Sequence, residues 1–359
     1  MESKEQFALG SRLTGRFTRR GSLGVLTALG LGTRPASDVD AGKRHGKRRS
    51  KKHPFCLNGQ TVNAAGKKKK KLVKRGATPG ACPVSCACAA NQLCDAGVCQ
   101  TCTVTCAEDA VSCGVRLQQA LLDGGTVYAC PGRYQGNFTA GSIRLVGAGS
   151  EADASANTIL DGGLTGRVLD IIPSSTVELA SLRITRGKTP SIANGGGING
   201  QSGTDLRITD CAIVDNQGSV GSGIAVDGAL RLTRSTLSGN VADYHGGISL
   251  VASAPSFITD SVISGNTSTL TVGGIGGGGL YHTGSPLSIV GTQISNNQSG
   301  TPGGGIANDS GDITLSASCS ITGNTAPSGG AIQSNAGMIA VNGATVSGNS
   351  TPQCVGASC

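Results

Sequence analysis

One short sequence pattern is written six times between residues 195 and 349. Each copy opens with small residues, mostly glycine, and an aliphatic residue, and closes with an aliphatic residue, two small or polar residues and an asparagine. The closing asparagines are separated by 24, 26, 31, 27 and 25 residues, and they are Asn216, Asn240, Asn266, Asn297, Asn324 and Asn349. A period in this range predicts a solenoid, in which each unit buries its apolar side chains against its neighbours.

Short alternating runs lie between the opening and the closure of most copies, as in Leu206-Arg207-Ile208 and Leu230-Arg231-Leu232. Alternation with a period of two residues is typical of a strand with one buried face, and the units have no room for an amphipathic helix. The sequence therefore predicts an all-β fold, a right-handed parallel β-helix solenoid with three short strands in each coil. At about 25 residues per coil, residues 126–353 make about nine coils.

We expect equivalent residues of successive coils to form columns along the solenoid, about 4.8 Å apart. The six closing asparagines would then stack at one corner and bond to each other and to the backbone of the turns, as amide side chains do in other stacked β-structures.

The repeats resemble those of the right-handed β-helix proteins of the pectate-lyase-like superfamily, and most of all the repeat of the chlamydial polymorphic outer-membrane proteins. Gly329-Gly330-Ala331-Ile332 matches the Gly-Gly-Ala-Ile signature of that repeat. Its Phe-x-x-Asn signature is met more loosely, since Ile, Leu or Val replaces Phe in every copy. The resemblance covers about the last two-thirds of the chain and implies the fold and exposure at a cell surface, but no particular activity.

A short helix is predicted before the first coil, with Val115, Leu117, Leu121 and Leu122 on one face. The helix, the strand after it and a Pro-Gly-x-Tyr turn resemble the entry of many pectate-lyase-like β-helices, where the helix covers the open end of the solenoid. A solenoid needs such a cap, because its terminal strands would otherwise pair with other chains. With this cap, the predicted β-helix spans residues 113–353.

The positive charge of the chain belongs to its first 80 residues, which hold 20 Lys and Arg against 4 Asp and Glu, whereas the rest hold 10 against 17. Residues 1–35, with Arg19-Arg20 before a modest apolar run, resemble a twin-arginine export signal. No stretch has the ~18 consecutive apolar residues of a membrane-spanning helix.

Residues 36–80 are predicted to be a disordered basic linker, because like-charged blocks do not fold on themselves. The alternative is a tail that holds an exported protein against an anionic cell envelope or an acidic polysaccharide. Nucleic acid is the least favoured partner, since no aromatic residues are interleaved for stacking.

Seven cysteines between residues 82 and 106 predict a small disulfide-bonded module over residues 81–112. Cys99-x-x-Cys102 has the spacing of a zinc site, but the other spacings are irregular and no histidine lies nearby, so we expect no metal and no cofactor. An odd number of thiols calls for one more partner, for which Cys56 and Cys113 are candidates.

Other cysteines lie outside this module. Cys113 and Cys130 flank the capping unit and are expected to bond. Cys354 and Cys359 would close a small loop in the tail at residues 354–359. Cys211 and Cys319 occupy one column four coils apart, about 19 Å, which is beyond disulfide reach, so both are predicted to be buried thiols.

A row of arginines is the first candidate binding site. Arg183, Arg207 and Arg231 each stand between two aliphatic residues, and we expect them to face outward in one column. Like charges in a row repel each other, and an extended polyanion such as an acidic polysaccharide would match them. The alternative is that neighbouring aspartates neutralise these arginines.

A second candidate site uses the only histidines beyond the basic segment. Asp243 and His245 precede one opening strand, and Tyr281 and His282 follow the next opening, with a lengthened coil between them. Tyr, His and Asp side chains can bind sugars or transfer protons. About 16 Å of extended chain separates the register positions of the two histidines, which disfavours a shared active site.

The favoured function is non-catalytic: an exported, disulfide-bonded β-helix that binds an acidic or cell-wall polysaccharide or acts as an adhesin. A polysaccharide lyase or glycoside hydrolase is the main alternative, and a purely structural surface rod is the third. No calcium-binding repeat, phosphate-binding loop or nucleophile-elbow serine is present in the sequence.

Overall fold

The computed structural model describes residues 53–57, 60–64, 68, 78–79, 86–190 and 193–359. The predicted export signal lies outside these residues, and so does most of the basic segment. Within that segment three strands pair as a small antiparallel sheet, which the prediction of a linker without regular structure had missed. These strands are β1 (His53–Leu57), β2 (Gln60–Ala64) and β3 (Thr78–Pro79).

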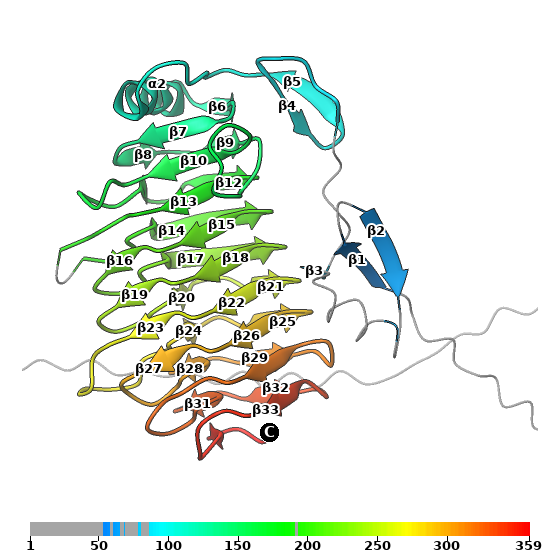
Figure 1. The fold of residues 1–359 in the computed structure, drawn as a ribbon. Coiled ribbons are helices and arrows are strands. Elements are labelled where there is room, and N and C mark those ends of the chain that lie inside the picture. Colours follow the sequence, from blue (N-terminus) through cyan, green and yellow to red (C-terminus); the bar gives the residue numbers. More distant parts are fainter. Residues whose placement is uncertain (1–52, 58–59, 65–67, 69–77, 80–85, 191–192) are drawn as a thin grey trace, which may run out of the picture. The chain divides into compact units, whose positions relative to one another are not determined.

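From residue 125 onward, parallel strands stack coil on coil in a β-solenoid of about nine turns, as the repeat predicted (Figure 1). One nine-stranded sheet takes one strand from each coil. Its members are β7 (Gly132–Gln135), β10 (Thr158–Asp161), β13 (Arg183–Thr185), β15 (Ala212–Val214), β18 (Thr236–Ser238), β22 (Val262–Ser264), β26 (Gln293–Ser295), β30 (Ser320–Thr322) and β33 (Thr345–Ser347).

The two other long sides of the coils share a sixteen-stranded sheet, because β14 and β17 run through the bend between these sides. The first side contains β8 (Phe138–Ala140), β11 (Leu169–Ile171), β14 (Ile198–Thr209), β17 (Ile224–Thr233), β20 (Ile248–Ala252), β24 (Leu280–Gly284), β28 (Ile306–Asn308), β31 (Ile332–Ser334) and β34 (Cys354–Val355). The second side contains β6 (Gly125–Tyr128), β9 (Ile143–Val146), β12 (Thr176–Ala180), β21 (Ser256–Thr259), β25 (Leu287–Val290), β29 (Ile313–Leu315) and β32 (Ile339–Val341), together with the later halves of β14 and β17.

A short four-stranded sheet lies at the corner that follows the closing asparagines. Its strands are β16 (Gln217–Gly218), β19 (Val241–Ala242), β23 (Thr267–Ser268) and β27 (Gln298–Ser299).

The core of the solenoid consists of aliphatic columns. The aliphatic residue of each opening is fully buried and pairs in register with its equivalent in the next coil, through Ile198, Ile224, Ile248, Leu280, Ile306 and Ile332. The aliphatic residues of the first five closures, from Ile213 to Ile321, are equally buried. Each coil therefore covers the apolar side chains of its neighbours, as expected of a repeat protein.

The closing asparagines form a continuous ladder of hydrogen bonds, as predicted. From Asn216 to Asn324, Nδ2 of each asparagine donates to Oδ1 of the next, over 2.8–3.0 Å. Each Nδ2 also donates to a backbone carbonyl of the preceding coil, such as that of Ile213 for Asn240. The ladder starts at the backbone N–H of Gly187 and ends at the side chain of Gln353, so its members are satisfied although they are buried.

The glycines of the openings are explained by this ladder. A Cβ on Gly247 would lie 2.5 Å from the carbonyl oxygen of Gly279 and 3.1 Å from Cγ of Asn266. The equivalent glycine of the coil before and that of the coil after, Gly223 and Gly279, meet the same obstacles. These glycines are needed because the backbone of one coil passes directly over the asparagine of its own corner.

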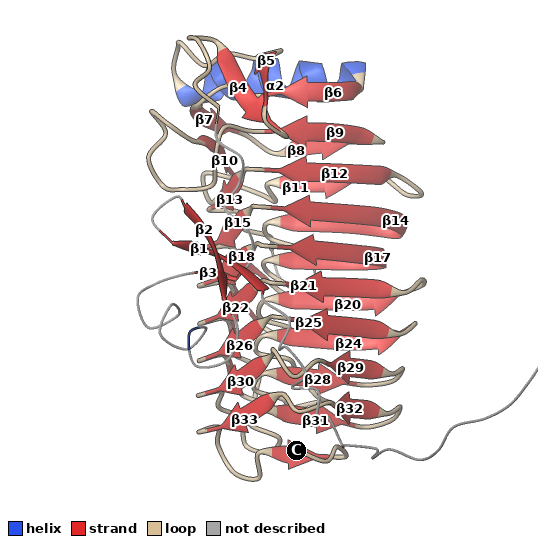
Figure 2. Cartoon of the chain, turned by 90° about the vertical axis from the view of Figure 1, so that its right-hand side faces the viewer, coloured by secondary structure: helices blue, strands red, loops and turns tan. Residues whose placement is uncertain are grey.

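Helix α2 (Ala110–Asp123) precedes the first strand of the solenoid, as predicted for a cap, and Figure 2 shows it beside β6. Asp109 caps its N-terminus, and Leu117 and Leu121 are buried. The expectation was wrong for Val115 and Leu122, which are 66% and 65% exposed. They lie on the far side of the helix: residues seven positions apart share a face, and at 3.6 residues per turn this face points away from that of Leu117.

The cysteine-rich module contains the antiparallel hairpin of β4 (Gln92–Asp95) and β5 (Val98–Thr101) and is disulfide-bonded, as predicted. Its bonds are Cys86–Cys94, Cys88–Cys99, Cys102–Cys130 and Cys106–Cys113. The expected Cys113–Cys130 bond was wrong, because both of these residues bond to the module instead. Cys354–Cys359 was confirmed, and Cys211 and Cys319 are buried free thiols, as expected.

Candidate functional site

The three arginines predicted to form one row do not share a column. Arg207 pairs in register with Arg231 on the side that contains β12, but the residue before them in that column is Glu178. Arg183 belongs to the nine-stranded sheet, where it pairs with Ala212. The prediction failed because Leu182-Arg183-Ile184 belongs to the strand that closes its coil, whereas Arg207 and Arg231 lie in the later halves of β14 and β17.

Arg207 and Arg231 share one carboxylate. Nη2 of Arg207 lies 2.6 Å from Oδ2 of Asp205, and Nη1 of Arg231 lies 2.5 Å from its Oδ1. Hydrogen bonding to Asp205 raises the pKa of Arg207. This cluster therefore has a formal charge of +1, which is much less than the row of three free cations that a polyanion would recognise.

His245 and Tyr281 are brought together although they come from different coils. Their rings are stacked, with centroids 3.8 Å apart and planes 5° from parallel. Ser249 is the register partner of Tyr281, and its hydroxyl lies 2.9 Å from Nδ1 of His245. The His245 ring thus folds over the glycines that follow it and lies against the next coil. Burial lowers the pKa of His245 to about 4, so the ring is neutral at pH 7.

Two of the other candidate residues lie away from this stack. His282 follows Tyr281 on β24 and points inward, where it is fully buried between Oδ1 of Asn308 at 2.8 Å and the carbonyl of Ser285 at 2.9 Å. Asp243 lies on the short side of the coil, next to β19. The structure therefore brings together His245 and Tyr281 but not the four residues proposed from the sequence.

A shallow groove runs along the outer face of β14, β17 and β20, next to the His245–Tyr281 stack. We call it the outer groove; its volume is about 250 Å³, and it is lined by polar groups around small residues, including Asn199, Gln201, Ala225, Asp227 and Ser249. At one end Asp170 accepts hydrogen bonds from Asn199 and Gln201 and pairs with Arg167.

Beyond the stack, Tyr281 continues the polar surface. Its hydroxyl lies 3.5 Å from Asp309, which also accepts a hydrogen bond from Asn335. Burial raises the pKa of Tyr281, so that the hydroxyl stays protonated and can donate at neutral pH. Amide, carboxylate and hydroxyl groups thus follow one another across several coils at the strand spacing.

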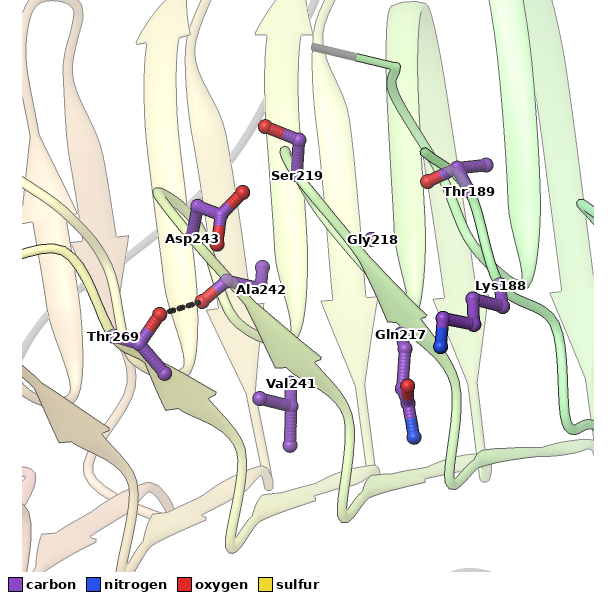
Figure 3. Close-up of a pocket in the computed structure, with 9 residues that line it drawn as sticks. All are labelled: Lys188, Thr189, Gln217, Gly218, Ser219, Val241, Ala242, Asp243 and Thr269. Carbon is purple, nitrogen blue, oxygen red and sulfur yellow. Dashed lines mark hydrogen bonds between the residues drawn. The ribbon is translucent and has the colours of Figure 1, made fainter. Parts of the chain in front are cut away.

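A second hollow lies on the short side of the solenoid, over β16 and β19 (Figure 3). We call it the side trough; its volume is about 410 Å³, and Lys188, Gln217, Ser219, Asp243 and Thr269 are among the residues that line it. Neither hollow was predicted, because both depend on which columns contain small residues. The repeated Gly and Ala positions were the available signal.

The sulfur atoms of Cys86, Cys88 and Cys99 lie within 4.8 Å of one another. These atoms are bonded in disulfides, and a disulfide sulfur lacks the thiolate charge with which cysteine binds a metal. Among the described residues, no helix is both long and apolar enough to cross a membrane.

Comparison with known proteins adds no functional assignment: no family model, curated protein or solved structure matches this chain.

Proposed function

We propose that this protein acts outside the cytoplasm as a non-catalytic binding rod for an extended cell-wall polysaccharide, which lies along the outer groove and the His245–Tyr281 stack. The observation that carries the proposal is the succession of solvent-facing polar groups beside an aromatic ring on one face of β14, β17, β20 and β24. Sites for small and extended ligands combine an apolar contact with a few placed polar groups in this way.

Export is supported by the disulfides. Five disulfide bonds are present among the described residues, which indicates an oxidising compartment. The twin-arginine-like leader supplies a route, and the basic segment supplies a contact with the anionic envelope; both belong to the proposal.

The charges favour a neutral or amino-sugar polymer over an acidic one. Asp170, Asp227 and Asp309 lie along the proposed binding face, and Arg167 balances only the first of them by an ion pair. A polyanion would meet like charge there. Its better match, the Arg207–Arg231 pair, is already half neutralised by Asp205.

The test uses the oxidised full-length chain with insoluble neutral, amino-sugar and acidic polysaccharides, and follows both co-sedimentation and new sugar ends. We expect retention without cleavage. Tyr281→Ala should weaken retention about tenfold, because an aromatic contact of this kind contributes about 1 kcal/mol or more. Phe257→Ala is the matched control, since Phe257 is an exposed aromatic residue on β21 and away from the groove.

Other results would replace the proposal. New reducing or unsaturated ends would indicate a hydrolase or lyase, with His245 and Ser249 as the first residues to change. No retention of any polymer would leave a structural rod as the best account. Equal loss in both aromatic variants would remove the groove from the proposal.

A further inference from the structure

The side trough contains polar side chains that have no partner among the described residues. Between residues 86 and 359 each of the nine arginines forms an ion pair with a carboxylate. Lys188 is the only lysine in that range, and it pairs with no carboxylate of the described residues. It lies in the side trough.

The opposite charge in the side trough is equally free. The carboxylate of Asp243 forms neither an ion pair nor a hydrogen bond with any described residue, although the residue is half-buried. The same holds for the side chains of Gln217 and Ser219, which lie between Lys188 and Asp243 (Figure 3). By contrast, Thr269 at the rim donates to the carbonyl of Ala242.

The two charges are too far apart in register to serve each other. Lys188 is bridged to Gln217, and Gln217 pairs with Val241, two residues before Asp243. Lys188 and Asp243 therefore lie two coil steps apart along the stack, about 10 Å, and two residues apart across it, about 7 Å, so that about 12 Å separates their backbone positions. An unpaired cation and an unpaired anion on one polar floor match a ligand with the reverse arrangement of charges.

We propose that the side trough binds a short peptide with free ends, whose carboxylate contacts Lys188 and whose ammonium group contacts Asp243. Three residues of extended chain span about 10 Å, and the long side chain of Lys188 covers the rest of the distance between the two backbone positions. Gln217 and Ser219 then meet the peptide groups between the two ends, since an amide and a hydroxyl both donate and accept hydrogen bonds. A volume of about 410 Å³ lies within the usual range for small-ligand sites.

This inference does not depend on the polysaccharide proposal, because the side trough and the outer groove lie on different sides of the coil. A polysaccharide that binds normally to a chain with an altered side trough, or the converse, would separate the two.

The experiment titrates triglycine into the oxidised full-length chain and follows binding by ligand-observed NMR. N-acetyl-triglycine and triglycine amide, in which one charged end is blocked, and N-acetyl-triglycine amide, in which both ends are blocked, are compared with the free peptide. We expect each block to weaken binding about fivefold, the effect of losing one solvent-exposed ion pair. Raised salt should weaken binding of the free peptide most.

The variants assign each end. Lys188→Met should remove the preference for a free carboxylate and leave the preference for a free amino group, and Asp243→Asn should do the reverse. Glu151→Gln is the control, because Glu151 is an exposed carboxylate away from the side trough. The melting temperature of each variant should be unchanged, since neither side chain has a partner to lose.

The inference is overturned if doubly blocked triglycine binds as tightly as the free peptide. It is also overturned if Lys188→Met and Asp243→Asn weaken all four peptides equally, or if saturation is not reached for the free peptide at millimolar concentrations.

Discussion

The ring of His245 lies flat on the ring of Tyr281, 3.8 Å away between centroids, although 35 residues of chain lie between the two positions. The contact arises because Tyr281 pairs in register with Ser249, whose hydroxyl holds Nδ1 of His245. One coil thus supplies the ring and the next supplies the surface on which it rests.

This stack makes stability depend on pH. In the unfolded chain His245 has a pKa near 6.5, whereas burial lowers its pKa to about 4 in the fold. As the pH falls below about 6.5, the unfolded chain takes up the proton first, so stability is lost. We expect His245 to account for a loss of about 2 kcal/mol in the free energy of unfolding between pH 6.5 and 4.5. Denaturant titrations of the wild type and of His245→Gln measure it; equal slopes with pH in the two chains would contradict the assignment.

The middle of the asparagine ladder should be the costliest place to interrupt it. Asn266→Ala removes the acceptor of Asn240, the donor to Asn297 and the side-chain donor to the Leu237 carbonyl. We expect a loss of about 3 kcal/mol in the free energy of unfolding. Asn349→Ala, at the last rung, should cost less than half as much, because water reaches that end. Equal losses at both positions would show that the ladder does not act as a buried network.

Glycine is expected to be essential at position 247 for steric reasons and not for its backbone freedom, since Gly247 has no positive φ. Gly247→Ala would place Cβ 2.5 Å from the carbonyl of Gly279, and we expect it to cost about 3 kcal/mol. Gly265→Ala is the matched control, since Gly265 has a φ of +64° with nothing within 4 Å, so only the left-handed conformation costs about 1 kcal/mol. Thermal unfolding of the two variants decides the order.

The two coil thiols should be inert while the chain is folded. Burial raises the pKa of Cys211 to about 12, so almost no thiolate forms at pH 8. Iodoacetamide should label Cys211 and Cys319 only after unfolding. Peptide mapping of the unreduced chain should recover a Cys102–Cys130 link; a Cys113–Cys130 link would restore the pairing that the sequence suggested.

The solenoid could be predicted from the sequence because its period is written in residues that have one structural role each. Residues equivalent to Asn240 and Gly247 recur in each copy. Each corner asparagine needs an acceptor in the next coil, and the backbone that passes over it has no room for a Cβ. The site could not be predicted in the same way. Arg183 and Arg207 have the same neighbours in sequence, and only the three-dimensional register assigns them to different sheets.

The candidate site was half found. His245 and Tyr281 were both candidates from the sequence. The distance expected between them assumed extended strands, whereas the His245 ring folds back across a glycine turn. The sequence also could not show that Asp243 belongs to the opposite side of its corner, because only Tyr244 lies between Asp243 and His245 in the sequence. Side-chain direction at a corner depends on turn geometry that the pattern of apolar residues does not encode.

The rungs Asn266 and Asn297 are bonded as tightly as the others, although their coil is the longest of the six and its extra residues form a loop beside the ladder. Residues inserted between two asparagines of the ladder therefore lie outside the core, and the neighbouring coils keep their register. A lineage of such proteins is free to lengthen, shorten or exchange these loops one at a time, and so to change what a coil meets at its surface. Recombination at the asparagines would join whole coils and leave the hydrogen-bond ladder unbroken.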